Sequence, residues 1–314
     1  MENPFSSRPG SLFGISQGHG FGVPNLLGVW RGAPQRVGDS GLLPTPTPKA
    51  PAAVKELFAI GCVLLACLSL LLMGGHGGLS QVHAQAMDPS PPSEVVKLVF
   101  IHHSCGDNWL DAGNGNLGDQ LGANNYYVSD TYYGWGPDDI GDNTDIGHWW
   151  TWFRGLSSST YTQAVYDTTN RHASYTRPMA DPGGENEIIL FKSCYPNSNL
   201  KGNPDDPPTN GDNPLRGQDC GSAHHTVANA KGIYNDLLEY FETRQDKLFV
   251  VISAPPVQSG TWADNARAFN TWLVEEWLVG YPHDNVAVFD FYNMLTSNGG
   301  SWNVNDFGWE TGNH

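Results

Sequence analysis

The sequence predicts an α/β fold built on a doubly wound parallel sheet, a flavodoxin-like three-layer sandwich. Five short, nearly continuous apolar runs follow residue 94, as expected of strands that are buried on both faces of a sheet. Between the third, fourth and fifth runs, apolar residues recur at helical spacing. Alternating strands and helices of this kind form right-handed crossovers between parallel strands.

Each strand is expected where an apolar run meets turn-forming residues. The first run is VVKLVFIH, the third is EIILFK and the fifth is VAVFDF, and the fourth stops at a pair of prolines. The second is rich in tyrosine, which favours strands. The predicted strands are Val95–His102, Tyr126–Tyr133, Glu187–Lys192, Leu248–Ser253 and Val286–Phe291.

Helices are predicted only in the second half of this domain. Apolar side chains recur at helical spacing within Ser222–Gln245 and again within Ala263–Leu278. Earlier connections read as irregular: a segment rich in Gly, Asn and Asp at Gly106–Gly122, an aromatic-rich excursion to about residue 182, and a polar loop at Pro196–Gly221. After the fifth strand only polar loop sequence is expected.

The first 94 residues have a different character. Residues 1–57 are rich in Gly and Pro and have no periodicity, which predicts a disordered extension. Phe58–Gly75 is an uncharged run of 18 residues, followed by an Ala-Gln-Ala cleavage signature that ends at Ala86. We expect residues 58–86 to be a signal peptide or, if uncleaved, a membrane anchor through residues 58–75. Residues 87–94 form a linker, and 95–314 form the domain, which is secreted or extracytoplasmic.

Charge is unevenly distributed and excludes one class of partner. Residues 1–57 carry five Lys or Arg and three acids, so the remaining 11 basic and 29 acidic residues give a balance of −18. A surface this negative repels phosphate backbones, so no nucleic-acid binding is expected. The first strand is not followed by G-x-G-x-x-G, so a dinucleotide site is not predicted either.

Three of the five cysteines lie beyond the apolar run, at Cys105, Cys194 and Cys220. Export would permit one disulfide and leave one thiol over. A Cys194–Cys220 bridge would close the polar loop, whereas a Cys105–Cys194 bridge would join two strand ends. The sequence leaves both pairings open.

Ser104 is the leading candidate for a nucleophile. Parallel sheets bind ligands at the carboxyl ends of their strands, and Ser104 comes directly after the first strand. A serine at such a turn has an exposed hydroxyl, with backbone N–H groups nearby that can stabilise an oxyanion. However, the pattern differs from G-x-S-x-G, because His102 stands two residues before the serine. The alternative is a serine that only shapes the turn.

The order of these elements resembles the SGNH (GDSL-like) hydrolase superfamily. In that family the nucleophilic serine follows the first strand, as Ser104 does in IHHSCG, although His102-His103 replaces the usual Gly-Asp. The family's oxyanion-hole glycine would be Gly134 or Gly136 in YYGWG, of which we take Gly136. Its oxyanion-hole asparagine would be Asn197 in FKSCYPNS. The resemblance therefore implies a carboxylic ester hydrolase.

The resemblance also predicts where the general base would lie. The family carries an Asp-x-x-His pair after its last strand, and no such pair follows Val286–Phe291. We expect the base and its acidic partner to lie beyond His314, and residues 1–314 alone to show little esterase activity. Asp145-Ile-Gly-His148 is the only internal match, and its position predicts a loop Asp and a surface His. His102 and His103 point to opposite faces of a strand, so neither is expected to accept the Ser104 proton.

An aromatic-rich stretch, Tyr126–Phe153, offers a second kind of site. Its nine aromatic side chains could form a platform for sugar rings or a groove for acyl chains, or else a local core. The predicted substrate-binding residues are Trp135, Trp149 and Trp150. No cofactor is expected. Ca²⁺ is the one option, either at the aspartates of this stretch or at Asp205, Asp206 and Asp212, but the EF-hand spacing is absent.

The sequence therefore predicts an exported ester hydrolase. Its substrate would be a polysaccharide acetyl group, a lipid-like ester or a polyester. The alternative is a non-catalytic carbohydrate-binding or adhesion domain on the same fold.

Overall fold

The computed structural model describes residues 90–256, 260–297, 303–304 and 310–313. The predicted extension at 1–57 and the signal or anchor segment at 58–86 therefore lie outside the described residues. Within the described ranges, no helix combines the length and apolar character needed to cross a membrane.

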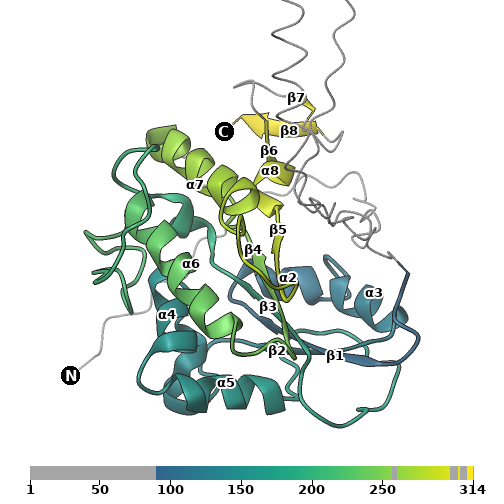
Figure 1. The fold of residues 1–314 in the computed structure, drawn as a ribbon. Coiled ribbons are helices and arrows are strands. Elements are labelled where there is room, and N and C mark those ends of the chain that lie inside the picture. Colours follow the sequence, from purple (N-terminus) through teal and green to yellow (C-terminus); the bar gives the residue numbers. More distant parts are fainter. Residues whose placement is uncertain (1–89, 257–259, 298–302, 305–309, 314) are drawn as a thin grey trace, which may run out of the picture. The chain divides into compact units, whose positions relative to one another are not determined.

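Five parallel strands form the central sheet, in the order β2-β1-β3-β4-β5 (Figure 1). All five predicted strands are present, and their ends lie within two residues of the predicted ones. The doubly wound α/β class is therefore confirmed. The strands are β1 (Val96–Ile101), β2 (Tyr126–Thr131), β3 (Ile188–Lys192), β4 (Leu248–Ile252) and β5 (Val286–Phe289).

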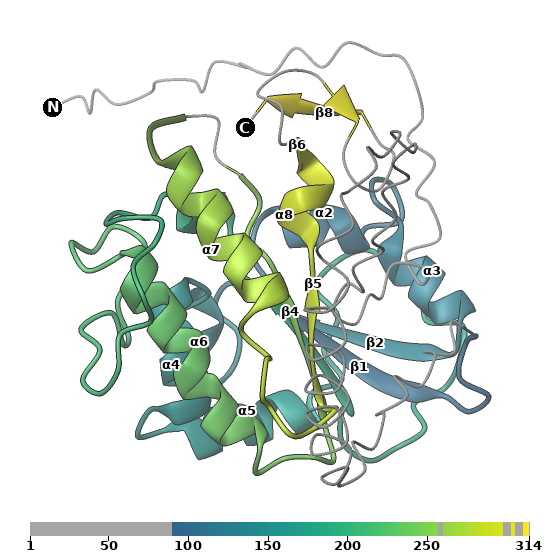
Figure 2. The same cartoon turned by 45° about the horizontal axis from the view of Figure 1, so that its top comes forward.

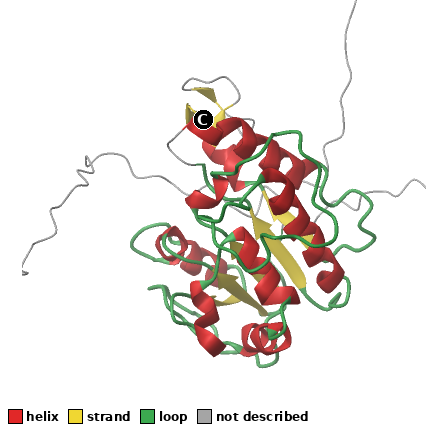
Figure 3. Cartoon of the chain, turned by 90° about the vertical axis from the view of Figure 1, so that its left-hand side faces the viewer, coloured by secondary structure: helices red, strands yellow, loops and turns green. Residues whose placement is uncertain are grey.

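Alternation along the strands gives the sheet two separate cores. Val99 and Ile101 of β1 face one cluster of buried side chains, and Leu98 and Phe100 face the other. Helices cover both faces, so a strand needs apolar residues at nearly every position (Figure 3). This double burial is why the strands read as continuous apolar runs.

The two faces carry different sets of helices (Figures 1 and 2). The larger core is formed with α4 (Ile146–Arg154), α5 (Ser158–Asp167), α6 (Val227–Phe241) and α7 (Ala263–Glu275). The smaller core is formed with α2 (Cys105–Leu110) and α3 (Leu117–Ala123). Both predicted helices, α6 and α7, are confirmed. Helix α6 begins later than predicted because the Thr226 hydroxyl caps it, accepting the Asn229 N–H at 3.2 Å.

Four helices before β3 were not predicted. Helices α2 and α3 have six and seven residues and contain three glycines, which are poor helix formers. Helix α4 (IGHWWTWFR) has only nine residues, and its aromatic side chains Trp149, Trp152 and Phe153 fill the larger core. Helix α5 is mostly Ser, Thr and Tyr. The aromatic excursion is therefore largely helical, which corrects the irregular prediction.

The chain after β5 also departs from the predicted polar loop. Helix α8 (Phe291–Leu295) is capped by Asp290, whose carboxylate accepts the Asn293 N–H at 3.2 Å. Three short strands follow and form a second sheet in the order β6-β8-β7. They are β6 (Thr296–Ser297), β7 (Asn303–Val304) and β8 (Glu310–Asn313).

The predicted polar loop Pro196–Gly221 is as expected, apart from a turn of 3₁₀ helix, η5 (Tyr195–Ser198).

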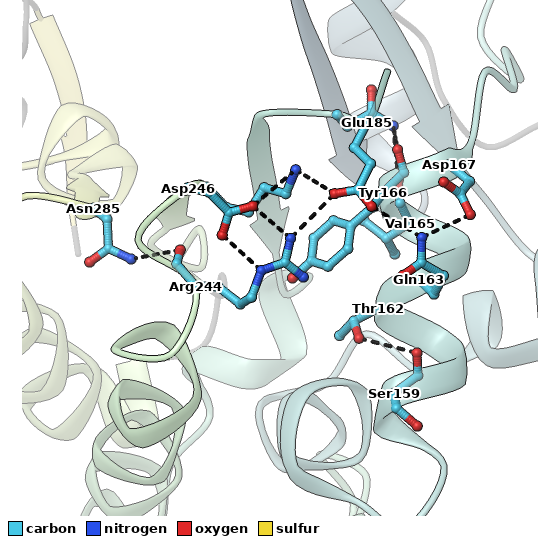
Figure 4. Close-up of polar contacts among 12 residues, drawn as sticks. Ser159, Thr162, Gln163, Val165, Tyr166, Asp167, Glu185, Arg244, Asp246 and Asn285 are labelled. Atoms are coloured by element: carbon cyan, nitrogen blue, oxygen red, sulfur yellow. Dashed lines mark hydrogen bonds and ion pairs between the residues drawn. The ribbon is translucent and has the colours of Figure 1, made fainter. Parts of the chain in front are cut away.

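An ion-pair cluster lies at the amino ends of β3 and β4 (Figure 4). Glu185, just before β3, accepts from Lys247 Nζ at 2.7 Å and lies 3.3 Å from the Arg244 guanidinium. Arg244 also pairs with Asp246 at 2.8 Å and stacks 4.2 Å from the centroid of the Tyr166 ring. Each charge in this cluster therefore has an opposite charge beside it.

Candidate active site

The carboxyl ends of β1, β2 and β3 meet at one edge of the sheet. Ile101 of β1 is paired with Thr131 of β2 on one side and with Phe191 of β3 on the other. The residues that follow these strands are therefore neighbours at this edge. Strand order reverses between β1 and β3, and doubly wound sheets bind their ligands at such a switch point.

Ser104 occupies a strained turn between β1 and α2. Its backbone has φ 48° and ψ −112°, a region that residues with a side chain rarely enter. The side chain is exposed at the edge of the sheet. A sharp strand–turn–helix junction with an exposed serine is the geometry of a nucleophile elbow. The turn therefore forms although the sequence lacks G-x-S-x-G.

Gly106 explains how α2 can follow so abrupt a turn. A Cβ added at Gly106 would lie 2.5 Å from His102 Cβ and 2.8 Å from His102 Nδ1. Only glycine lets the helix cross this close to the end of β1. The second glycine of the elbow pattern is thus kept, and the histidine takes the place of the first.

The backbone N–H groups that follow the serine differ in whether they are already hydrogen-bonded. Gly106 and Asp107 N–H donate to His103 O and Ser104 O, each at 3.0 Å, which closes the turn. Cys105 is the first residue of α2, so its N–H has no acceptor within the helix. Of the two candidate glycines, Gly134 donates its N–H to Asp142 Oδ1 at 2.8 Å.

Gly136 is the other candidate glycine and differs from Gly134. It has φ 81° and is exposed, and its N–H donates no hydrogen bond to any described residue. The predicted choice of Gly136 over Gly134 is compatible with this geometry.

A buried histidine–aspartate pair supports the elbow from β2. The His102 Nε2–H donates to Asp130 Oδ2 at 3.1 Å, and both side chains are fully buried. Burial lowers the pKa of His102, so its ring is neutral. Burial would raise the pKa of Asp130, but hydrogen bonds from His102, Tyr175 and the Ala173 N–H together lower it.

The free nitrogen of His102 does not reach the serine hydroxyl. Its Nδ1 is buried without a hydrogen-bond partner among the described residues, and it faces the position of a Gly106 Cβ. His103 is engaged elsewhere: its Nε2 contacts Gly141 O, its Nδ1 lies 3.0 Å from the Thr144 hydroxyl, and its ring stacks on Tyr133. In the described part of the chain, no imidazole hydrogen-bonds Ser104. The expectation that neither histidine serves as its base agrees with these contacts.

Lys192 is a buried cation at the end of β3 that sequence reasoning missed. Its side chain is 1% exposed, and Nζ lies 3.4 Å from Cys194 Sγ and 5.4 Å from the centroid of the Trp109 ring. Within the described residues, no carboxylate oxygen lies within 4.0 Å of this ammonium. A lysine is rarely buried without a paired anion. A lysine at the end of a strand predicted to be buried on both faces was the only feature of the sequence that could have indicated this site.

Asn197 is placed as a structural residue rather than an oxyanion donor. Its Nδ2 group donates to Asp145 Oδ1 at 2.6 Å and to Cys194 O at 3.3 Å, and its Oδ1 accepts the Ile146 N–H at 2.8 Å. The side chain is fully buried. Both amide hydrogens are therefore occupied, which corrects the expectation that Asn197 helps to bind an oxyanion.

Asp145 and His148 form the start of α4. The Asp145 N–H donates to His148 Nδ1 at 3.2 Å, and the Cys220 N–H donates to Asp145 Oδ2 at 2.9 Å. Burial would raise the pKa of Asp145, but the hydrogen bonds from Asn197 and Cys220 lower it. This Asp-x-x-His therefore caps a helix and does not contact Ser104.

The predicted tryptophan platform is not exposed. Trp149 is fully buried, and its Nε1–H donates to Ser193 Oγ at 2.9 Å. Trp135 stacks on Trp152 in the larger core, and Trp150 packs against that core. Trp135 and Trp149 are therefore core residues, and the alternative of a local core is the one observed.

Tyrosines take the exposed positions at the site instead. Tyr133 is 51% exposed after β2, and Tyr195 is 58% exposed after β3. Tyr132 lies between His102 and the exposed His172, with ring centroids 5.7 and 5.5 Å apart. These side chains lie in or beside segments that the sequence marked as aromatic or strand-terminal. Their exposure could not be read from composition.

In the described part of the chain, no group of three or more His, Cys, Asp or Glu side chains is arranged to hold a metal ion. Comparisons with protein-family models, with curated proteins and with solved structures found no match to this chain.

Proposed function

We propose that this chain is an exported serine hydrolase of the SGNH type that acts on carboxylic esters, with Ser104 as its nucleophile. The observation that carries the proposal is the Ser104 backbone, which holds an exposed hydroxyl on a strained strand–helix turn. Strain of this kind persists where the surrounding structure enforces it, and it concentrates at active sites. The location at the β1/β3 switch point supports the same assignment.

In the proposed reaction, Ser104 Oγ attacks the ester carbonyl and forms a tetrahedral intermediate. The Cys105 N–H, next to the nucleophile, donates to the developing oxyanion, as the following residue does in other nucleophile elbows. The Gly136 N–H is the proposed second donor. Collapse of the intermediate expels the alcohol and leaves an acyl-serine, which water then hydrolyses.

The hydroxyl proton needs an acceptor, and the described contacts assign none. By the sequence resemblance, this base would belong to an Asp-x-x-His pair that follows the last strand. In a test, an added small molecule can take its place.

Exposed tyrosines support an ester carried on a sugar. Tyr133 and Tyr195 flank the turn from the neighbouring strands, and tyrosine faces stack on sugar rings while the hydroxyl remains in water. Among the predicted substrates, acetylated polysaccharide fits these side chains better than a long acyl chain. The same tyrosines also favour the second candidate, a carbohydrate-binding domain without catalysis.

Serine-directed labelling tests the proposal. The 314-residue chain is incubated with a fluorophosphonate probe, with and without added imidazole, and the modified residue is mapped by mass spectrometry. Ser104 lies in the tryptic peptide 98–154. We expect labelling at Ser104, faster with imidazole because imidazole accepts the hydroxyl proton, and no labelling of that peptide in Ser104→Ala.

Ser159 provides a matched control, because it is also exposed but lies in the regular helix α5. Ser159→Ala should leave labelling unchanged. A probe that never modifies Ser104 under either condition would reject the hydrolase. Retention on an acetylated glycan that survives Ser104→Ala but fails in Tyr133→Ala would then support the binding domain.

A further inference from the structure

The three described cysteines lie in two different surroundings. Cys105 opens α2 after β1, and Cys194 follows β3 by two residues, so the sheet brings them to the same edge. Cys194 Sγ lies 3.8 Å from the carbonyl oxygen of His103, two residues before Cys105, and each thiol shifts the pKa of the other. Cys220 lies apart from this pair, where its thiol hydrogen-bonds to Asp145. All three are free thiols and are half-buried.

The buried ammonium of Lys192 gives this pair its electrostatic character. Lys192 Nζ is 3.4 Å from Cys194 Sγ and also acts on Cys105. Because no described carboxylate balances Lys192, a thiolate is the anion that this cation can stabilise. The neutral rings of His102 and His103 lie on the β1 side of the pair.

The two thiols are in unequal protonation states. The hydrogen bond from the Cys194 thiol lowers the pKa of Cys105, and the Lys192 charge lowers it further, although burial opposes both. The pKa of Cys194 is raised because it donates that hydrogen bond and is buried. The opposite directions of these two pKa shifts, beside one buried ammonium, favour one thiolate and one thiol, which is the arrangement of an attacking and a resolving cysteine.

We propose that Cys105 and Cys194 form a redox-active dithiol that hydroperoxides oxidise to a disulfide. The Cys105 thiolate attacks one oxygen of the hydroperoxide, the O–O bond breaks, and an alkoxide leaves and takes a proton from water. Cys105 is then a sulfenic acid. The Cys194 sulfur attacks it, the S–O bond breaks, and the thiol proton leaves with the hydroxyl as water.

The overall reaction converts one thiolate, one thiol and ROOH into a disulfide, ROH and hydroxide, so two electrons pass from sulfur to oxygen. This site does not depend on Ser104 being a nucleophile. It also resolves the two pairings that the sequence left open, since it joins Cys105 to Cys194 and leaves Cys220 as the unpaired thiol.

Peptide mapping after oxidation tests the dithiol. The full chain is reduced, desalted and treated with cumene hydroperoxide, then alkylated and digested with trypsin. Cleavage separates the three cysteines into peptides 98–154, 193–201 and 217–231. We expect a disulfide that links the first two peptides, reversed by dithiothreitol. A link between 193–201 and 217–231 would overturn the proposal, as would oxidation of Cys105 without any link.

Three variants separate the roles of the residues. In Cys194→Ser, Cys105 should stop at the sulfenic acid, which dimedone traps. In Cys220→Ser, the matched control, the link should form at the wild-type rate. Lys192→Met should slow oxidation of Cys105 by about tenfold or more because the thiolate loses its cation. An unchanged rate in a folded Lys192→Met protein would contradict the role given to this lysine.

Discussion

The two edges of the central sheet treat buried charge differently. At the amino edge, Arg244, Lys247, Glu185 and Asp246 neutralise one another, and all of them except the buried Lys247 lie partly in solvent (Figure 4). At the carboxyl edge, Lys192 is buried without a carboxylate among the described residues, and Ser104 is strained. Paired surface charges serve stability and little else. The carboxyl edge retains unbalanced groups that destabilise the fold, and such groups are available for chemistry.

The largest expected effect comes from Asp130, a buried carboxylate that accepts four hydrogen bonds. Asp130→Asn would keep the shape but point an amide N–H at groups that are themselves donors, including the His172 and Ala173 N–H. We expect a loss of about 3–5 kcal/mol in the free energy of unfolding, measured by urea denaturation. Asp246→Asn at the amino edge should cost less than about 1 kcal/mol. Equal costs would remove the contrast between the edges.

Lowering the pH should destabilise the unmutated protein through its buried histidines. Burial lowers the pKa of His102, His103, His148 and His225, so the unfolded chain takes up their protons at a higher pH than the folded one. Their contribution to stability is complete above pH of about 6.5 and is lost as the pH falls toward the folded values. Each can remove up to about 2 kcal/mol between pH 6.5 and 5. Urea midpoints across this range should fall, and less steeply in His102→Gln.

Packing at the elbow gives the next effect. Gly106→Ala would place a methyl group against the His102 ring, so we expect a loss of about 1–3 kcal/mol and slower labelling of Ser104. Gly134→Ala is the control, since a Cβ there meets nothing within 4 Å and only the φ of 68° is strained. It should cost about 1 kcal/mol and leave labelling intact. Thermal unfolding and probe kinetics measure both.

Thiol reactivity sharpens the comparison further. At pH 7, Cys105 should react with iodoacetamide about tenfold or more faster than Cys220, because its thiolate is stabilised. Burial and the Asp145 charge raise the pKa of Cys220 to about 11, so it stays a thiol at this pH. The Cys105 rate should fall on acidification, as its thiolate takes up a proton. Equal rates for the two cysteines would show that Lys192 does not act on Cys105.

The smallest effect belongs to the amino edge. Glu185→Gln removes one charge from the cluster with Lys247 and Arg244 but leaves Asp246 to balance them. We expect less than about 1 kcal/mol, and a difference that shrinks as salt is added. A larger loss that resists salt would mean that this edge is more than a surface ion-pair cluster.

The sheet and the position of the serine could be predicted from the sequence because both depend on local patterns. A strand buried on both faces must be apolar throughout, so β1 and β3 to β5 were readable within two residues. Side-chain environments depend on distant partners and could not be read. Trp149 is buried because Ser193 accepts its N–H, and the Asn197 amide is occupied because Asp145 and Cys194 lie beside it. The sequence does not distinguish Lys192 from an ordinary residue at the end of a strand, because its burial depends on residues that are distant in the chain.

Strand order also determines when the parts of the carboxyl edge come together during synthesis. A nascent chain that has emerged as far as β2 already holds Ser104 and its His102–Asp130 support, since β1 and β2 are neighbours. It lacks the lysine and the second thiol, because Cys194 lies 91 residues after the His103 carbonyl that it contacts. Closing so long a loop is entropically costly and slow compared with local pairing. The serine turn is therefore translated well before Lys192 and Cys194, and the reactive edge is completed only when β3 joins β1.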